Sequence, residues 1–425
     1  MTTRMTPEEC AACMRALQPK IDNYAELLVR DGAAVQPGQE LVVQAPVEAR
    51  EFARRVVAAA YAAGAGHVTV IWADDEIIRM EYEALPVERF ETVPSWKVEQ
   101  LNSLAEAGAA FLFLEGSDPS ALKGVDPAKP ATASRARNSQ CKSFREGMDF
   151  GRNAWCIAGV PVLAWARQMF EGLSDDEAMY RLWLAILETS RADGDDPHEE
   201  WETHNAAFEK NMRMLNGRSF DRLHYTSSNG TDFVVGLPKG HLWEGGAART
   251  TSGVSFFPNI PTEEVFTSPD RMRADGRVVS ALPLVHNGSI VRDFWFEFRD
   301  GAVVDFGAEQ GTEVLKGILD TDENACRLGE VALISKNTPI RQTGLLFYDT
   351  LYDENASCHL ALGTGFPECL EGGVDMSPEQ LIEHGVNHSH THVDFMIGAD
   401  DLAIRGITAD GEEVDVFVNG QWAWE

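Results

Sequence analysis

The hydrophobic pattern of the chain changes near residue 215, and this change limits the possible folds more than any other sequence feature. Before it, short apolar runs that suit strands alternate with longer segments of helical periodicity. Such alternation is typical of a sheet covered by helices. We therefore predict an α/β N-terminal domain over residues 1–215, with strands at residues 40–46, 67–74, 109–119 and 155–161.

The helices of this half carry recognisable start and stop signals. Gly64 is expected to end the helix after the first strand, because glycine accepts the left-handed conformation that follows a helix. Ser174 is expected to cap a second helix, and Pro197 to begin a third. No G-x-G-x-x-G motif follows any expected strand, so the phosphate-binding loop of a dinucleotide domain is missing.

After residue 215 the chain consists of short alternating segments separated by turn dipeptides such as Asp300-Gly301 and Asn419-Gly420. Residues 294–306 and 412–424 have the pattern of hairpins. Two helical segments interrupt the strands, near residues 309–320 and 377–385. We therefore predict an α+β, β-rich C-terminal domain over residues 216–425, and the catalytic residues discussed below all fall in it.

Length and charge narrow the class of protein. A chain of 425 residues exceeds the size at which single cores stop growing, which favours two domains. The formal net charge of −31 argues against binding to nucleic acid or to an anionic membrane, because either would need a basic patch. The N-terminus has no apolar signal segment, and the seven scattered cysteines suit reduced thiols, so we expect a cytoplasmic protein.

Three residues near the C-terminus suggest a metal site. His392 and Asp394 are separated by one valine, and a strand would place both on the same face. Together with the distant His359 they offer imidazole and carboxylate groups, which coordinate divalent ions. Two histidines and one carboxylate also satisfy the rule for mononuclear iron(II) oxygenases, so these three residues leave both possibilities open.

Three glutamates extend this set. Glu264, Glu330 and Glu354 stand in apolar or turn-flanked settings, and Glu330 interrupts the apolar run LGEVALI. Burial of an ionised carboxylate is costly unless a cation accompanies it, although each glutamate alone also suits a salt bridge. Six such ligands match a pair of divalent ions that share a bridging carboxylate, as in dinuclear hydrolases. The nearby histidines are further candidate ligands or outer partners: His384, His388 and His390.

These residues resemble those of the M29 metallo-aminopeptidases, the thermophilic aminopeptidase group. The resemblance covers nearly the whole chain. Residues 23–48 and 59–75 are similar to the N-terminal domain of that family. The segments that resemble its catalytic motifs are NIPTEEVFTSP, LGEVALI, LFYDTLYDENASCHLALG and GVNHSHTHVDFMIG.

The resemblance carries expectations for the site and the assembly. The matching positions bind metal in the family: Glu264, Glu330, Glu354, His359, His392 and Asp394. The equivalent of Glu330 bridges two ions, and the family forms homodimers that partly enclose their active sites. One position departs from the family, because Phe366 stands where a tyrosine implicated in catalysis is common. A phenylalanine cannot donate a hydrogen bond to an oxyanion; Tyr348 and Tyr352 are the nearest replacements.

The leading hypothesis is a metal-dependent aminopeptidase that releases N-terminal amino acids from peptides with a free N-terminus. Two divalent ions per subunit, zinc, cobalt or manganese, would activate a water molecule, and Glu264 or Glu354 would accept its proton. The iron(II) oxygenase is the first alternative, but it leaves the three glutamates without a role. The second is a binding protein that keeps the fold and has lost catalysis, for which Phe366 is the sole support.

Overall fold

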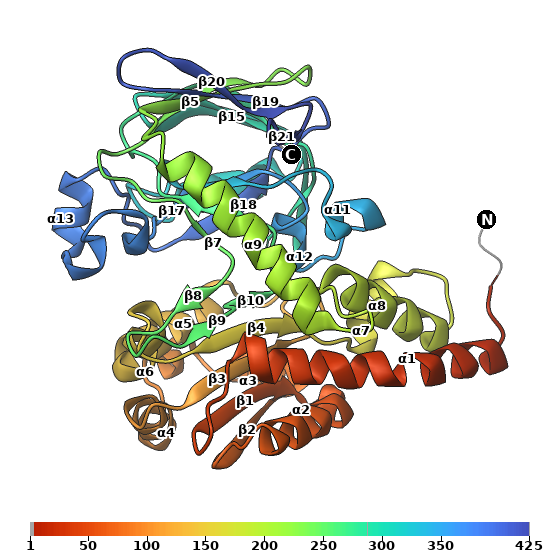
Figure 1. The fold of residues 1–425 in the computed structure, drawn as a ribbon. Helices are drawn as coiled ribbons and strands as arrows, with labels where there is room; N and C mark the ends of the chain where they lie inside the picture. Colours follow the sequence, from red (N-terminus) through yellow and green to blue (C-terminus); the bar gives the residue numbers. More distant parts are fainter. Residues whose placement is uncertain (1–3, 287, 425) are drawn as a thin grey trace. The chain divides into compact units, whose positions relative to one another are not determined.

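The structure is a computed structural model that describes residues 4–286 and 288–424, and its architecture is mixed α/β with parallel and antiparallel sheets (Figure 1). The chain divides into two compact units. The first comprises Met1–Thr203 and Ala247–Pro261, and the second His204–Gly246 and Thr262–Glu425. The expected boundary at residue 215 lies near the end of helix α9 (Pro197–Asn216), which begins in the first unit and ends in the second. We propose that each unit is a domain.

The first unit is built on a five-stranded parallel sheet with the order β10-β4-β3-β1-β2. Leu41, Val42 and Val43 lie in β1, an interior strand between β3 and β2, and all three are buried, as expected for a strand covered on both faces. The four strands predicted for this half are confirmed, with these bounds: β1 (Glu40–Pro46), β2 (His67–Ala73), β3 (Ala110–Glu115) and β4 (Trp155–Gly159).

The expected start of α8 and the expected end of α2 are confirmed. Ser174 accepts a hydrogen bond from the Glu177 amide at the start of α8, and Gly64 has φ +93° just after α2. The helices are α1 (Pro7–Leu27), α2 (Arg50–Ala62), α3 (Asp75–Ala84), α4 (Ser95–Glu106), α5 (Ala128–Gln140), α6 (Lys142–Asp149), α7 (Leu163–Met169) and α8 (Asp175–Thr189).

The chain returns to the first unit after α9. Strands β8 (Ala248–Arg249) and β9 (Ser255–Phe256) form a short antiparallel pair, and β10 (Asn259–Ile260) adds a parallel strand beside β4. Strands of two residues have no hydrophobic period, so sequence patterning alone does not reveal this return.

The second unit contains a nine-stranded antiparallel sheet. Both predicted hairpins are confirmed: Asp300-Gly301 joins β14 to β15 and Asn419-Gly420 joins β20 to β21, with positive φ at all four residues. The strands are β5 (Arg222–Thr226), β6 (Asp232–Gly236), β12 (Ala274–Val279), β13 (Leu284–His286), β14 (Ser289–Arg299), β15 (Ala302–Gln310), β19 (Ala403–Ile407), β20 (Glu413–Val418) and β21 (Gln421–Trp422).

A second, five-stranded antiparallel sheet lies against the first in this unit. Its order is β18-β17-β16-β11-β7. The Phe395 ring packs 5.0 Å from that of Phe296 on the larger sheet, measured between ring centroids, and each such buried ring contributes about 2–3 kcal/mol. The strands are β7 (Glu244–Gly245), β11 (Val265–Thr267), β16 (Leu328–Leu333), β17 (His359–Gly363) and β18 (His392–Met396).

Among the residues that the structure describes, the second unit also has four short α-helices, two of which match the helical segments expected near residues 309–320 and 377–385. Ser377 caps α13 by accepting a hydrogen bond from the Gln380 amide. The helices are α10 (Thr312–Leu319), α11 (Pro339–Thr343), α12 (Thr350–Glu354) and α13 (Pro378–Glu383).

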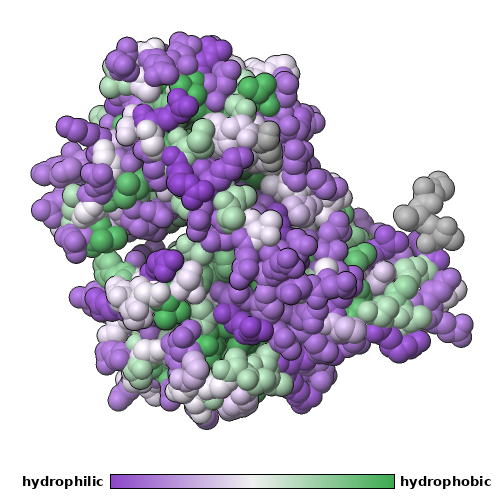
Figure 2. Space-filling model, viewed as in Figure 1, coloured by the Kyte–Doolittle hydropathy of each residue, from purple (hydrophilic) through white to green (hydrophobic). Residues whose placement is uncertain are grey.

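Hydrophilic side chains predominate on the face of the molecule drawn in Figure 2, with hydrophobic ones scattered among them. Within residues 4–286 and 288–424, none of the helices combines the length and the apolar character needed to cross a bilayer.

Candidate metal centre

The five-stranded sheet of the second unit, β18-β17-β16-β11-β7, has one apolar face and one face that carries the candidate ligands. Because side chains alternate along a strand, Leu360 and Phe395 point into the core, whereas His359, His392 and Asp394 point to the opposite face. Cross-strand pairing aligns them: Ala361 of β17 pairs with Asp394 on one side and with Glu330 on the other. The sequence pattern of three strands therefore collects four candidate ligands on one surface.

Small residues stand opposite the two histidines. Ala332 pairs with His359, and Gly363 pairs with His392. Gly363 has φ +112°, and a Cβ atom there would lie 2.0 Å from the carbonyl oxygen of Thr391. Only glycine suits this position.

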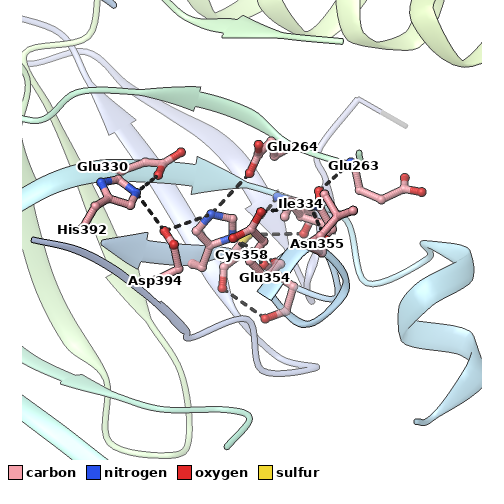
Figure 3. Close-up of polar contacts among 12 residues, drawn as sticks. Glu263, Glu264, Glu330, Ile334, Glu354, Asn355, Cys358, His392 and Asp394 are labelled. Atoms are coloured by element: carbon pink, nitrogen blue, oxygen red, sulfur yellow. Dashed lines mark hydrogen bonds and ion pairs between the residues drawn. The ribbon is translucent and has the colours of Figure 1, made fainter. Parts of the chain in front are cut away.

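The ligand atoms form two groups that share one residue (Figure 3). Glu264, Glu330 and His359 make up the first group, and Glu330, His392 and Asp394 the second. Within each group the ligand atoms lie within 4.8 Å of one another. The structure thus brings five of the six predicted ligands together, with Glu330 common to both groups.

Both histidines are oriented by backbone carbonyls. Nδ1 of His359 donates to the carbonyl oxygen of Glu354 at 3.0 Å, and Nδ1 of His392 donates to that of Thr364 at 2.9 Å. In the neutral ring, Nε2 then carries the lone pair. This atom of His359 faces the Glu264 carboxylate at 3.3 Å, and that of His392 faces Glu330 at 3.1 Å and Asp394 at 3.2 Å.

Burial and mutual repulsion perturb the ionisation of this cluster. Burial raises the pKa of Glu330 to about 7, and the charges of Glu264 and Asp394 act in the same direction. Burial alone would lower the pKa of His359, but the contact with Glu264 and the neighbouring carboxylates outweigh it and raise that pKa to about 10. The cluster therefore needs added positive charge, as protons on the imidazoles or as a bound cation.

The donor set suits divalent metal ions. Lone pairs of two neutral imidazoles would face carboxylate oxygens across 3.1–3.3 Å, an arrangement that is repulsive unless a proton or a metal ion lies between them. The second ring nitrogen of each histidine donates to a carbonyl, which is how metal-ligating histidines are commonly held. Mixed nitrogen and oxygen ligands fit zinc and similar borderline ions.

Glu354, the sixth predicted ligand, ends helix α12 and lies outside both ligand groups. Its carboxyl group is buried beside the cluster (Figure 3), so burial first, and then the charges of Asp394 and Glu264, raise its pKa well above the ordinary value. The structure therefore places Glu354 beside the other five residues but outside both ligand groups.

Asn355 supports this site, although sequence reasoning did not single it out. Its side chain is fully buried; Oδ1 accepts a hydrogen bond from the Glu263 amide at 2.7 Å, and Nδ2 donates to the Leu351 carbonyl at 2.9 Å. It thereby ties the residue before Glu264 to the helix that ends in Glu354. The sequence shows only an asparagine directly after a candidate ligand, and neither its burial nor its bond to the Glu263 amide can be read from that position.

A second contact holds the same loop. His204, in α9, donates from Nε2 to the Thr262 carbonyl at 2.8 Å, and this nitrogen lies 3.6 Å from the Glu263 carboxylate. Glu263 points away from the ligand cluster (Figure 3). The two neighbouring glutamates thus have different environments, and Glu264 alone joins a ligand group.

Other histidines and the cysteine near the motif lie outside the ligand groups. The three upstream histidines, His384, His388 and His390, are exposed and belong to neither group found among the described residues. Cys358 points to the other side of its strand and exchanges hydrogen bonds of 3.3 Å with the backbone of Ile334. Its environment is that of a structural thiol.

Phe366 lies beside the cluster. The centroid of its ring is 5.1 Å from that of His392. Of the two tyrosines considered as replacements for the missing hydroxyl, Tyr352 is fully buried with its ring stacked on Phe347, so it does not offer its hydroxyl to a substrate. Tyr348 is partly exposed and has φ +58°.

Comparison with known proteins places the chain in a family. The profile described as thermophilic metalloprotease (M29) matches residues 17–422. The chain belongs to the M29 metalloprotease family. Its resemblance to that family is therefore confirmed, and the protein is a peptidase that depends on divalent metal.

Individual relatives are similar in sequence to this chain over their full length. Aminopeptidase 2 of Geobacillus stearothermophilus is 44% identical over 412 residues, which are 97% of this chain and 100% of the relative. Aminopeptidase T of Thermus thermophilus is 42% identical, with 96% and 100% covered. The solved structure of wild-type AmpT from Thermus thermophilus superimposes with a TM-score of 0.89 at 40% identity, covering 96% of this chain and 100% of that one.

Proposed function

We propose that this M29 metalloprotease is an aminopeptidase that releases N-terminal amino acids from peptides through a dinuclear metal centre. The observation that carries the dinuclear centre is the sharing of Glu330 between two ligand groups. The proteins that align over the full length of the chain are named aminopeptidases, which supports the exopeptidase activity.

In this proposal, Glu264, Glu330 and His359 hold one divalent ion and Glu330, His392 and Asp394 hold the other. Zinc, cobalt and manganese all suit these ligands. Such ions, when bound, lower the pKa of a coordinated water molecule and polarise the scissile carbonyl group. The carbonyls of Glu354 and Thr364 keep the two imidazoles in the orientation that this binding needs.

Glu354 is the better candidate for the general base. It lies outside both ligand groups, and its raised pKa makes its carboxylate a stronger base than an exposed glutamate. It would accept the proton of the attacking water and pass it to the leaving amine. Glu264 remains the alternative. Glu354→Gln should lower kcat and retain metal, whereas Glu264→Gln should lower metal content.

The proposed substrates are peptides with a free N-terminus. The net charge of −31 favours the approach of a cationic ammonium group and disfavours nucleic acid and anionic membranes. We also propose a cytoplasmic homodimer.

The test compares aminoacyl p-nitroanilides with a free amine and the same compounds after N-acetylation, using protein loaded with zinc, cobalt or manganese. Cleavage restricted to the free amines is expected. Equal cleavage of both forms would contradict an exopeptidase that recognises the amine. The iron(II) oxygenase gains no support, because membership of a metalloprotease family and the proximity of Glu264 and Glu330 to the two histidines both favour hydrolysis.

A further inference from the structure

Solvent reaches the ligand cluster from the side of His392. Its side chain is 24% exposed, whereas that of His359 is 1% exposed. A substrate must therefore approach the cluster near His392, and the residues around this imidazole are the first that it meets.

Two phenylalanine rings flank that opening. The centroid of Phe366 lies 5.1 Å from that of His392, and the centroid of Phe266 lies 5.4 Å from that of Phe366 in an edge-to-face arrangement. Phe266 shares the ligand face, because it pairs with Ala332, which pairs in turn with His359. Both phenylalanines are partly exposed, although phenylalanine is usually buried.

Phe366 is held firmly at this position. Its amide donates to Oγ of Ser268 at 2.7 Å, and Oγ of Ser268 lies 3.3 Å from the Phe366 carbonyl oxygen. Thr364, two residues earlier, accepts the hydrogen bond from His392. The ring and the imidazole are thus fixed relative to each other by one loop, which favours binding by a preformed surface.

We propose that Phe366 and Phe266 form the subsite for the side chain of the substrate's N-terminal residue and that they select large apolar side chains. The inference rests on the proposed aminopeptidase function. In an aminopeptidase, the side chain next to the scissile carbonyl projects beside the metal ligands, and these rings supply apolar surface at that place. Leucine and phenylalanine would bury far more area against them than alanine would.

A cationic side chain of the substrate's N-terminal residue is the alternative occupant of this subsite. Glu244 lies on the same face, directly opposite Phe266 on β7, and is partly exposed. However, β7 is two strands away from β16, which carries Glu330, and this corresponds to roughly 10 Å at about 4.8 Å per strand. The nearer candidate ligand, Glu264, adjoins Val265, which pairs with Gly245 and not with Glu244. The aromatic pair lies nearer to the ligands, so it contacts the side chain first.

The experiment measures kcat/KM for leucine, alanine and arginine p-nitroanilides, together with inhibition constants of free leucine and free alanine. It uses the full-length, metal-loaded wild type, Phe366→Ala and Phe366→Leu. The matched control is Phe150→Ala, which removes a 40%-exposed ring from the first unit. Metal content and thermal unfolding are recorded for each variant.

Wild type should prefer leucine to alanine by at least about tenfold, since pocket contacts with single methylene groups give discrimination of this order. Phe366→Ala should reduce the preference severalfold in both kcat/KM and inhibition, whereas Phe366→Leu and Phe150→Ala should retain it. An equal loss for leucine and alanine in Phe366→Ala would show that the ring only positions His392 and would overturn the subsite. A wild-type preference for arginine would also overturn it.

Failure of the proposed function is distinguishable from failure of the subsite. Wild type that cleaves none of the three compounds overturns the aminopeptidase proposal, and this inference with it. Wild type that cleaves them with a leucine preference that Phe366→Ala leaves unchanged overturns the subsite alone.

Discussion

Asn355→Ala tests how the metal centre is held together. The substitution removes two buried hydrogen bonds and leaves the amide of Glu263 and the carbonyl of Leu351 without these partners. An unpaired buried polar group costs about 1–3 kcal/mol, so the variant should lose roughly 2–6 kcal/mol of stability. Because Glu263 adjoins Glu264 and Asn355 adjoins Glu354, metal affinity should also fall by roughly 10–100-fold, as for other outer-sphere partners.

Scanning calorimetry on the metal-loaded protein measures the loss of stability, and a competitive chelator titration measures the loss of metal affinity. At about 2–4 °C per kcal/mol for a unit of this size, the unfolding midpoint should fall by at least about 4 °C. Asn337→Ala is the matched control, because Asn337 is exposed in the same unit and its loss should change the midpoint by about 2 °C or less. A midpoint and a metal affinity both equal to those of wild type would refute the reasoning.

Three further predictions concern the candidate ligands and the backbone beside them. Glu330→Gln should lose metal and activity together, as measured by elemental analysis and peptide hydrolysis; unchanged turnover would contradict the bridging role of Glu330. Gly363→Ala should unfold at a markedly lower temperature, because its Cβ atom would lie 2.0 Å from the Thr391 carbonyl oxygen; a wild-type midpoint would argue against this backbone conformation. The metal-free protein should lose stability as pH rises from about 4.5 to 7, because folding raises the pKa of Glu330 from 4.5 to about 7. It should lose further stability between about pH 6.5 and 10, because folding raises the pKa of His359 from 6.5 to about 10. Urea titrations at several pH values measure this, and a flat profile would contradict it.

Much of the secondary structure could be predicted because its signals are local. The turn Asn419-Gly420 and the cap Ser174 act through their immediate neighbours, and both were found where the sequence placed them. The return of residues 247–261 to the first sheet could not be predicted. It depends on pairing between β10 and β4, more than a hundred residues apart, through two residues with no hydrophobic period.

In the candidate site, too, local signals could be predicted and long-range contacts could not. His392 and Asp394 were recognisable because a strand places residues two apart on one face, and the structure puts them in one ligand group. Asn355 was not, because its role depends on the distant Glu263 amide. Phe366 was noticed as a departure from the family, but its neighbours Phe266 and His392 became visible only in the fold.

The number of metal ions bound per chain tests the dinuclear centre most directly. Purified protein would be depleted with a chelator, reloaded with zinc, cobalt or manganese, freed of excess ion and analysed for metal and protein together. We expect two ions per chain in the wild type and one or none in Glu330→Gln, because Glu330 belongs to both ligand groups. A single ion in fully active wild-type protein would contradict it.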